Sequence, residues 1–244
     1  MRSPIILHDT LYKYRYVIRS LIPKKIKNLR FPAVRDLELE LYLLDKYNVL
    51  CSTYDYRIYD FWRAYCTSPL DVFSFAKKFF STIDLTNYNI LSEFYYKEAD
   101  ENVRAALFLL MNRCGSHVNF FKDSFNLQEA SDVEAFLGGH KHFLPNNFFV
   151  SHEPISTQIG RPMSFTVIDL PQLNFENHIP GVMDTSFSSK NLYGLLCERS
   201  NWCLKTDMSR IIQPWLDKFD FYYLASDGRR SLSDTNKILF FKTN

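Results

Sequence analysis

The chain has 244 residues, of which 46% are hydrophobic, so it can bury a sizeable core as one domain or as one domain with an insertion. Its 29 Lys and Arg residues nearly balance 27 Asp and Glu residues, and the net charge of +2 excludes a global field that would attract nucleic acid or a membrane surface. No apolar run approaches the roughly 18 residues of a membrane span, so we expect a cytoplasmic protein.

The cysteine and glycine contents exclude further classes of protein and of binding site. The five cysteines form an odd set without a C-x-x-C pair, which predicts buried, reduced thiols and neither a disulfide framework nor a zinc knuckle. Only 7 glycines occur, well below the roughly 7% of residues that is usual, and the first is Gly115. Glycine-rich loops that wrap a phosphate or a cofactor are therefore excluded from the N-terminal half.

The N-terminal quarter predicts two alternations of helix and strand. Apolar residues at helical spacing predict a helix over Tyr12–Ile22, and a short strand follows over Asn28–Val34. A second helix is predicted over Asp36–Leu44 and a second strand over Tyr47–Thr53. Asp55 lies two residues after that strand, at the position where open α/β folds contact a ribose.

The rest of the chain predicts a helical block and then a sheet. Tyr56–Leu110 is helical by pattern, and Asn112–Gln128, which has no period, predicts a structured loop. Strands are predicted over Asn147–Val150, Ser164–Ile168, Trp202–Thr206, Phe219–Ala225 and Lys237–Lys242, with helices over Ser189–Arg199 and Ser209–Lys218. This alternation favours a parallel sheet with helices on both faces and an antiparallel hairpin at its edge.

Several short sequence motifs along the chain resemble motifs of one known family. They are Leu21-Ile22-Pro23, then Phe31-Pro32-Ala33-Val34-Arg35 in the place of F-x-G-x-G, Tyr54-Asp55, Phe94-Tyr95, Arg104-Ala105-Ala106-Leu107-Phe108, Asn112-Arg113, Phe125-Asn126 and Asp169-Leu170-Pro171-Gln172 in the place of D-P-P-Y. In this order they resemble the Dam-type DNA adenine methyltransferases.

The resemblance implies an α/β fold of the Rossmann-like methyltransferase type. It implies a mostly parallel seven-strand sheet with a C-terminal antiparallel hairpin and a helical insert. Residues 1–55 and 145–244 would form the methyltransferase-like core, and residues 56–144 would form the insert, which resembles a target-recognition region.

The resemblance also implies a set of site residues. Asp169 would accept a hydrogen bond from the target amine, with the Leu170 carbonyl beside it, Pro171 fixing the turn and Gln172 standing where the family stacks a Tyr on the base. Phe31, Ala33, Arg35 and Asp55 would contact the methyl donor, S-adenosylmethionine. Asn112, Arg113, Lys122 and Asn126 would contact DNA.

A metal site is not expected. His140, His142 and His152 lie near one another in the sequence, but no Cys accompanies them and only Glu153 stands at a ligand spacing. We therefore predict no metal and no membrane among the partners, which leaves DNA or another protein.

The chain departs from the family where the chemistry is most demanding. Ala33 and Arg35 replace both glycines of the donor loop, and Gln172 removes a stacking contact worth about 1–3 kcal/mol. We therefore predict a methyltransferase-like protein with impaired catalysis that acts as a DNA- or protein-binding or structural module. Two alternatives stay open: an active but divergent DNA adenine methyltransferase, and a different nucleotide-binding α/β protein.

Overall fold

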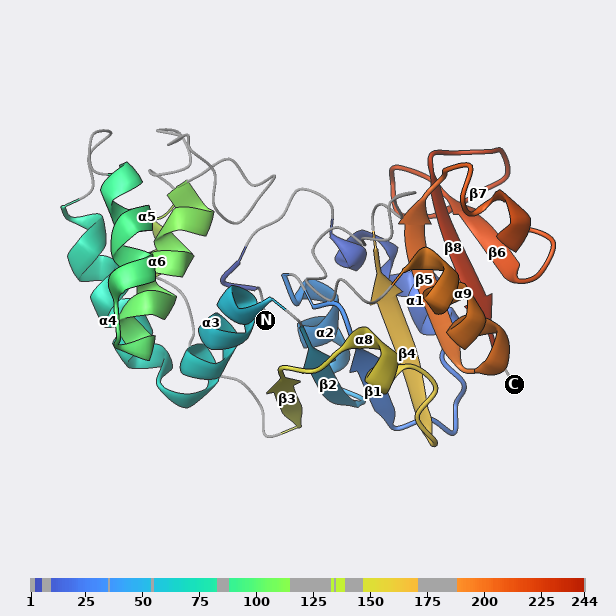
Figure 1. Ribbon diagram of the computed structural model, residues 1–244, viewed down its shortest axis with the longest axis horizontal. Helices are drawn as coiled ribbons and strands as arrows, with labels where there is room; N and C mark the ends of the chain where they lie inside the picture. The colour runs from blue at the N-terminus through green and yellow to red at the C-terminus, as the bar shows by residue number, and fades with distance from the viewer. Residues whose placement is uncertain are drawn as a thin grey trace. The chain divides into compact units, whose positions relative to one another are not determined.

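The computed structural model describes residues 3–5, 10–34, 36–53, 55–82, 88–114, 133, 135–138, 147–170 and 188–243. The chain divides into two compact units (Figure 1). The sheet unit comprises Thr10–Asp55 and Asn146–Asn244, and the helical unit comprises Arg2–Asp9 and Tyr56–Pro145.

The sheet unit is built on one mixed sheet of eight strands among its described residues. The strands are β1 (Asn28–Phe31), β2 (Asn48–Ser52), β3 (Phe148–Ser151), β4 (Ser164–Asp169), β5 (Trp202–Asp207), β6 (Asp220–Leu224), β7 (Arg230–Ser231) and β8 (Lys237–Lys242). Their order is β3-β2-β1-β4-β5-β8-β6-β7. The first five pair in parallel, whereas β8 is antiparallel to both β5 and β6.

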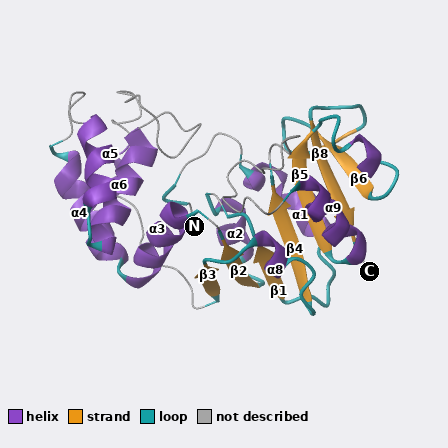
Figure 2. Ribbon diagram, viewed as in Figure 1, coloured by secondary structure: helices purple, strands orange, loops and turns teal. Residues whose placement is uncertain are grey.

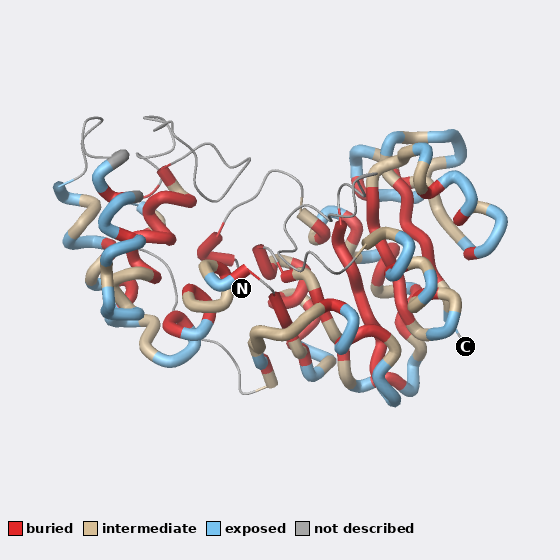
Figure 3. The backbone as a smooth tube through the Cα atoms, in the orientation of Figure 1, coloured by how far each residue is buried: buried red, intermediate tan, exposed pale blue. Residues whose placement is uncertain are grey.

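The α/β class and the mostly parallel sheet are confirmed, but the details at the C-terminal side differ from the prediction. The sheet has eight strands, because the two-residue strand β7 is added beside β6. The final strand β8 pairs with β6 as expected but lies between β5 and β6, and not at the sheet edge. Its four central residues are all buried, as befits a strand covered on both faces (Figure 3).

Helices cover both faces of this sheet. They are α1 (Arg15–Leu21), α2 (Glu38–Leu43), α8 (Ile155–Gln158) and α9 (Ser189–Glu198), with 3-10 turns at Leu11–Tyr14 and Gln213–Trp215. In Figures 1 and 2, α9 lies in front of the sheet and α1 behind it. Leu192 and Leu196 of α9 belong to the same buried cluster as Ile168, Trp202 and Phe240 from the strands.

The predicted helix over Ser209–Lys218 is wrong. Only Gln213–Trp215 is helical there, and as a 3-10 turn. Pro214 lies in the middle of the segment, and a proline ring removes one N–H donor and blocks the carbonyl four residues earlier, which breaks an α-helix. The apolar residues of the segment are buried all the same, since Ile212 and Trp215 both join the core cluster.

The helical unit contains α3 (Tyr56–Thr67), α4 (Pro69–Phe80), α5 (Tyr88–Lys97) and α6 (Glu101–Cys114). Helix α6 packs against the other three, and every residue from Ala105 to Asn112 is buried. The expected loop over Asn112–Gln128 therefore begins too early, because α6 continues to Cys114. Residues 115–128 lie outside the described residues.

The cysteines and the helices bear on two further expectations. All five cysteines are thiols; Cys51, Cys114 and Cys203 are buried, but Cys66 is exposed and Cys197 half-buried, so the expectation of burial is wrong for these two. Among the described residues no helix is both long enough and apolar enough to cross a membrane.

We expect Gly228→Ala to destabilise the sheet unit. Gly228 has φ +88°, and a Cβ there would lie 2.2 Å from the carbonyl oxygen of Lys13, so the backbone would have to shift. Overpacking of this kind costs about 1–3 kcal/mol. Gly194→Ala in α9 is the matched control, because no atom lies within 4 Å of its added Cβ and alanine is the better helix former by about 0.5–1 kcal/mol. Urea unfolding of both variants measures the difference, and equal stabilities would contradict it.

Candidate functional site

The candidate site lies where the strand order reverses. Strands β1 and β4 are neighbours in the sheet, but the chain runs from β1 to one side, through β2, and from β4 to the other, through β5 (Figure 1). Open α/β sheets bind ligands at such a switch point, beyond the carboxyl ends of the strands. In this chain Phe31 ends β1, Asp169 ends β4, and Asp55 follows β2 by three residues.

The two faces of β4 have different partners. Ile168 belongs to the apolar cluster under α9. Because side chains alternate along a strand, Asp169 faces the opposite side of the sheet. Lys205 of β5 stands directly opposite Asp169 in the parallel pairing, so its side chain shares that face.

An ion pair joins these two residues inside the protein. The Lys205 Nζ atom lies 3.0 Å from Asp169 Oδ1, with Lys205 completely buried and the Asp169 side chain 7% exposed. A lysine is almost never fully buried unless its charge is paired, because desolvating an ammonium group costs several kcal/mol. Asp169, the residue expected to bind a target amine, therefore already binds an internal one.

Two more carboxyl groups, those of Asp36 and Glu40, line the same small pocket as Asp169. Asp36 and Glu40 are both buried, and Glu40 lies on α2. Burial raises the pKa of the Glu40 carboxyl well above its ordinary value, and the negative charge of Asp36 raises it further. The site thus combines three acidic side chains with one ammonium group, and its environment favours the neutral form of Glu40.

The raised pKa of Glu40 predicts a pH-dependent effect of Glu40→Gln. The unfolded chain ionises Glu40 near pH 4.5, whereas the folded chain retains the proton to higher pH, so this residue lowers stability as pH rises from there to its folded pKa. Gln cannot ionise. We expect the stability of the variant relative to wild type to increase as the pH rises above about 4.5, measured by urea unfolding over a series of pH values. A constant difference would show that Glu40 ionises alike in both states.

The space enclosed at the switch point is very small. It is lined by Leu11, Phe31, Ala33, Asp36, Glu40, Val167 and Asp169, and its volume of about 10 Å³ is roughly what one water molecule needs. Sites for molecules the size of a cofactor measure about 300–1,000 Å³. Among the described residues, the space beside Phe31 and Ala33 is therefore much smaller than a cofactor site.

The turn after β1 includes a left-handed backbone conformation at a residue that is not glycine. Leu37 adopts the left-handed conformation, with φ 61°, immediately before α2. This conformation is strained for a residue with a Cβ, and the fully buried Leu37 side chain helps to offset the cost. The Leu37 side chain thus fills core space beside this turn. A loop that binds a methyl donor would instead present glycine backbone there.

The residues predicted for catalysis and donor binding are only partly described. Phe31 and Ala33 line the small cavity together with Asp169, and Leu170 is buried in the cluster under α9. Asp55 is also buried, and its backbone N–H donates to Thr53 Oγ1 at 3.1 Å. Arg35, Pro171 and Gln172 lie outside the described residues.

The residues predicted for DNA contact belong to the helical unit. Asn112 is buried on α6. The Arg113 guanidinium donates to the carbonyl oxygens of Pro4 and Ser3, at 2.6 and 3.1 Å, and lies 3.8 Å over the ring of Phe136. Lys122 and Asn126 lie outside the described residues. The two candidates that are described therefore make internal contacts.

Lys205, Glu40 and Asp36 were not predicted as site residues from the sequence. The usable signal was a charge at a position whose neighbours are apolar: Lys205 follows Trp-Cys-Leu in a buried strand, and Glu40 stands between Leu39 and Leu41. Asp36 precedes Glu40 by four residues. A charged side chain at a buried position usually pairs with another charged or polar group, and the sequence alone does not identify that group.

Other sites and known proteins add no candidate. No group of three His, Cys, Asp or Glu side chains in the described part of the chain is placed to hold a metal ion. No protein-family model matches the chain, and no curated protein matches it.

Proposed function

We propose that this chain is a methyltransferase-like protein that resembles DNA adenine methyltransferases in its layout and does not transfer methyl groups. It serves as a binding or structural module. The parallel order β3-β2-β1-β4-β5, followed by an antiparallel β8, supports this ancestry. We also propose that seven of the strands correspond to the family's sheet and that β7 is an addition at the edge.

The observation that carries the proposal is the buried ion pair. The amine of a target base needs the Asp169 carboxylate, but the Lys205 ammonium lies 3.0 Å from it and is completely buried. The donor would need several hundred cubic ångströms beside Phe31 and Ala33, where about 10 Å³ is enclosed. Both observations support the proposal that neither the donor nor the target base is bound at this position.

A protein partner or a structural role is favoured over DNA. Asn112 is buried, and the Arg113 guanidinium is bonded to backbone carbonyls. The net charge of +2 provides little general attraction for phosphate. A DNA-binding role would have to use other residues.

An active, divergent DNA adenine methyltransferase is the second candidate. One observation favours it: Asp55 follows the carboxyl end of β2 and Asp169 ends β4, and both lie at the sheet edge where α/β proteins bind ligands. For this candidate the Lys205–Asp169 ion pair would have to open and the chain around Phe31 would have to move outward.

Two assays on the purified protein separate these candidates. The first measures transfer of a radiolabelled methyl group from S-adenosylmethionine to duplex DNA, with a working Dam-type enzyme assayed in parallel. The second measures retardation of the same DNA in a gel. We expect no transfer and no specific retardation. Transfer above background would establish the enzyme, and retardation without transfer would identify a DNA-binding module.

A further inference from the structure

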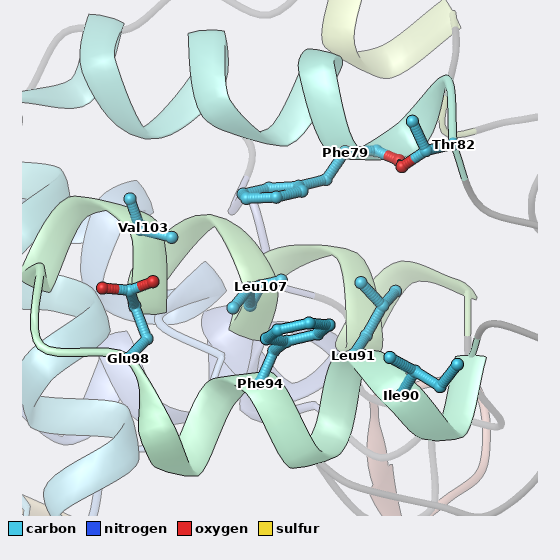
Figure 4. A pocket seen from close by; sticks show the side chains of 8 residues that line it. All are labelled: Phe79, Thr82, Ile90, Leu91, Phe94, Glu98, Val103 and Leu107. Atoms are coloured by element: carbon cyan, nitrogen blue, oxygen red, sulfur yellow. The ribbon is translucent and has the colours of Figure 1, made fainter.

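The helical unit contains a pocket that the proposed function does not use. It measures about 350 Å³ and lies between α4, α5 and α6. It is lined by Phe79, Thr82, Ile90, Leu91, Phe94, Glu98, Val103 and Leu107 (Figure 4). This volume falls within the range of small-molecule sites.

The walls of the pocket are mainly apolar, and part of them is open to solvent. Figure 4 shows Phe79 of α4 and Phe94 of α5 pointing into the space between the helices from opposite sides. Leu91 and Leu107 are buried and form its base, whereas Phe94 and Ile90 are 56% and 45% exposed. Large apolar side chains held open around a concave surface are typical of a binding site.

Among the described residues, Glu98 is the one charged side chain that lines the pocket. Its Oε1 atom accepts hydrogen bonds from the backbone N–H groups of Ala99 and Asp100, at 2.8 and 3.0 Å, which fixes the carboxylate at the start of α6. The Thr82 hydroxyl donates its proton to the Phe79 carbonyl, so it offers the pocket no donor. The polar groups that the described residues bring to the pocket are therefore negative and poor in donors.

We propose that this pocket binds a small organic cation: a flat, apolar body that lies between Phe79 and Phe94 and carries one ammonium group that pairs with Glu98. Apolar walls reward burial of a hydrocarbon body. The fixed carboxylate selects an ammonium group over a carboxylate, which it repels. The concave shape favours a compact molecule, and the rim formed by Ile90 and Phe94 lets it enter.

Three probes with one naphthalene body test the proposal: naphthylmethylammonium, neutral naphthylmethanol and anionic naphthylacetate. Each is titrated into the full chain while the methyl NMR signals of Leu91, Val103 and Leu107 are followed. We expect all three signals to shift with the ammonium probe. We expect its affinity to exceed that of the neutral probe by about two- to fivefold, the value of one partly exposed ion pair. The acetate probe should bind most weakly.

Three variants test how much the Glu98 charge and the Phe94 ring contribute to binding. Glu98→Gln keeps an oxygen for the two backbone N–H groups, and it should lower ammonium affinity to that of the neutral probe while leaving the neutral probe unchanged. Glu93→Gln is the matched control, because Glu93 is exposed on α5, pairs with Lys97 at 3.7 Å and does not line the pocket. Phe94→Ala should weaken the ammonium and neutral probes alike.

Specific results would overturn the proposal. They are absence of ammonium binding up to millimolar concentration, equal affinities for the ammonium and acetate probes, or an unchanged preference in Glu98→Gln. Sedimentation of the free protein covers a further occupant: a dimer that Phe94→Ala dissociates would mean that a second copy of the chain fills the pocket. Circular dichroism of each variant confirms that the helices are retained.

Discussion

Lys205→Met lowers the free energy of unfolding by about 3–5 kcal/mol, the usual cost of removing one partner from a buried ion pair. Lys205 is completely buried and lies 3.0 Å from Asp169 Oδ1, so the substitution leaves a carboxylate in the protein interior without its counter-charge. Buried Glu40 and Asp36 border the same space and add further acidic groups. Urea unfolding at neutral pH measures the loss.

A second variant separates the ion pair from the packing of the lysine chain. Asp169→Asn combined with Lys205→Met removes both charges, and we expect the double variant to recover most of the stability lost in Lys205→Met. Lys218→Met, at an exposed position, is the matched control and should change stability by less than about 0.5 kcal/mol. A loss below about 1 kcal/mol for Lys205→Met would contradict the assignment of a buried ion pair.

Phe108→Ala should destabilise the helical unit by a similar amount, about 3–5 kcal/mol. Phe108 is fully buried on α6, and its ring centroid lies 5.3 Å from that of Phe61 on α3. Truncation leaves a cavity where α3 and α6 pack together. Amide hydrogen exchange measures the effect segment by segment, and we expect faster exchange in α3, α4 and α6.

The same exchange experiment tests the division into two compact units. If the sheet unit opens independently, the amides of β4 and β5 keep their wild-type exchange rates in Phe108→Ala. Equal acceleration in the strands would show that the two units open as one. Tyr96→Ala, at a residue of α5 that is 67% exposed, serves as the control and should leave all segments nearly unchanged.

The strands were predictable from the sequence because their signals are local. Trp202–Thr206 and Lys237–Lys242 are runs of apolar and β-branched residues, and the observed strands match them within one residue. The position of β8 inside the sheet was not predictable from such runs, since strand order depends on contacts between distant segments. Pro214 shows the opposite case, because this helix-breaking residue is itself a local signal against an α-helix over Ser209–Lys218.

The site was predictable only to the level of individual strand ends. Asp55 was predictable because an acidic residue after a parallel strand of an open α/β fold commonly contacts a ribose. Asp169 followed from the resemblance of Asp169-Leu170-Pro171-Gln172 to D-P-P-Y. Lys205 pairs with Asp169 across 36 positions of the sequence, and such a partner becomes visible only once the register of β4 and β5 is fixed. The scarcity of glycine predicted a poor donor loop. The charge of Glu40 between Leu39 and Leu41 was a local signal of a buried group, but it did not identify the groups around that carboxyl.

We propose that the switch-point site does not bind a methyl donor. Calorimetric titration of the purified protein with S-adenosylmethionine tests this proposal without depending on catalysis. We expect no binding heat up to millimolar donor, because the space between Phe31, Glu40 and Asp169 has a volume of about 10 Å³, roughly what one water molecule needs. Binding at micromolar affinity, with one donor per chain, would contradict it and would make the divergent enzyme the better account.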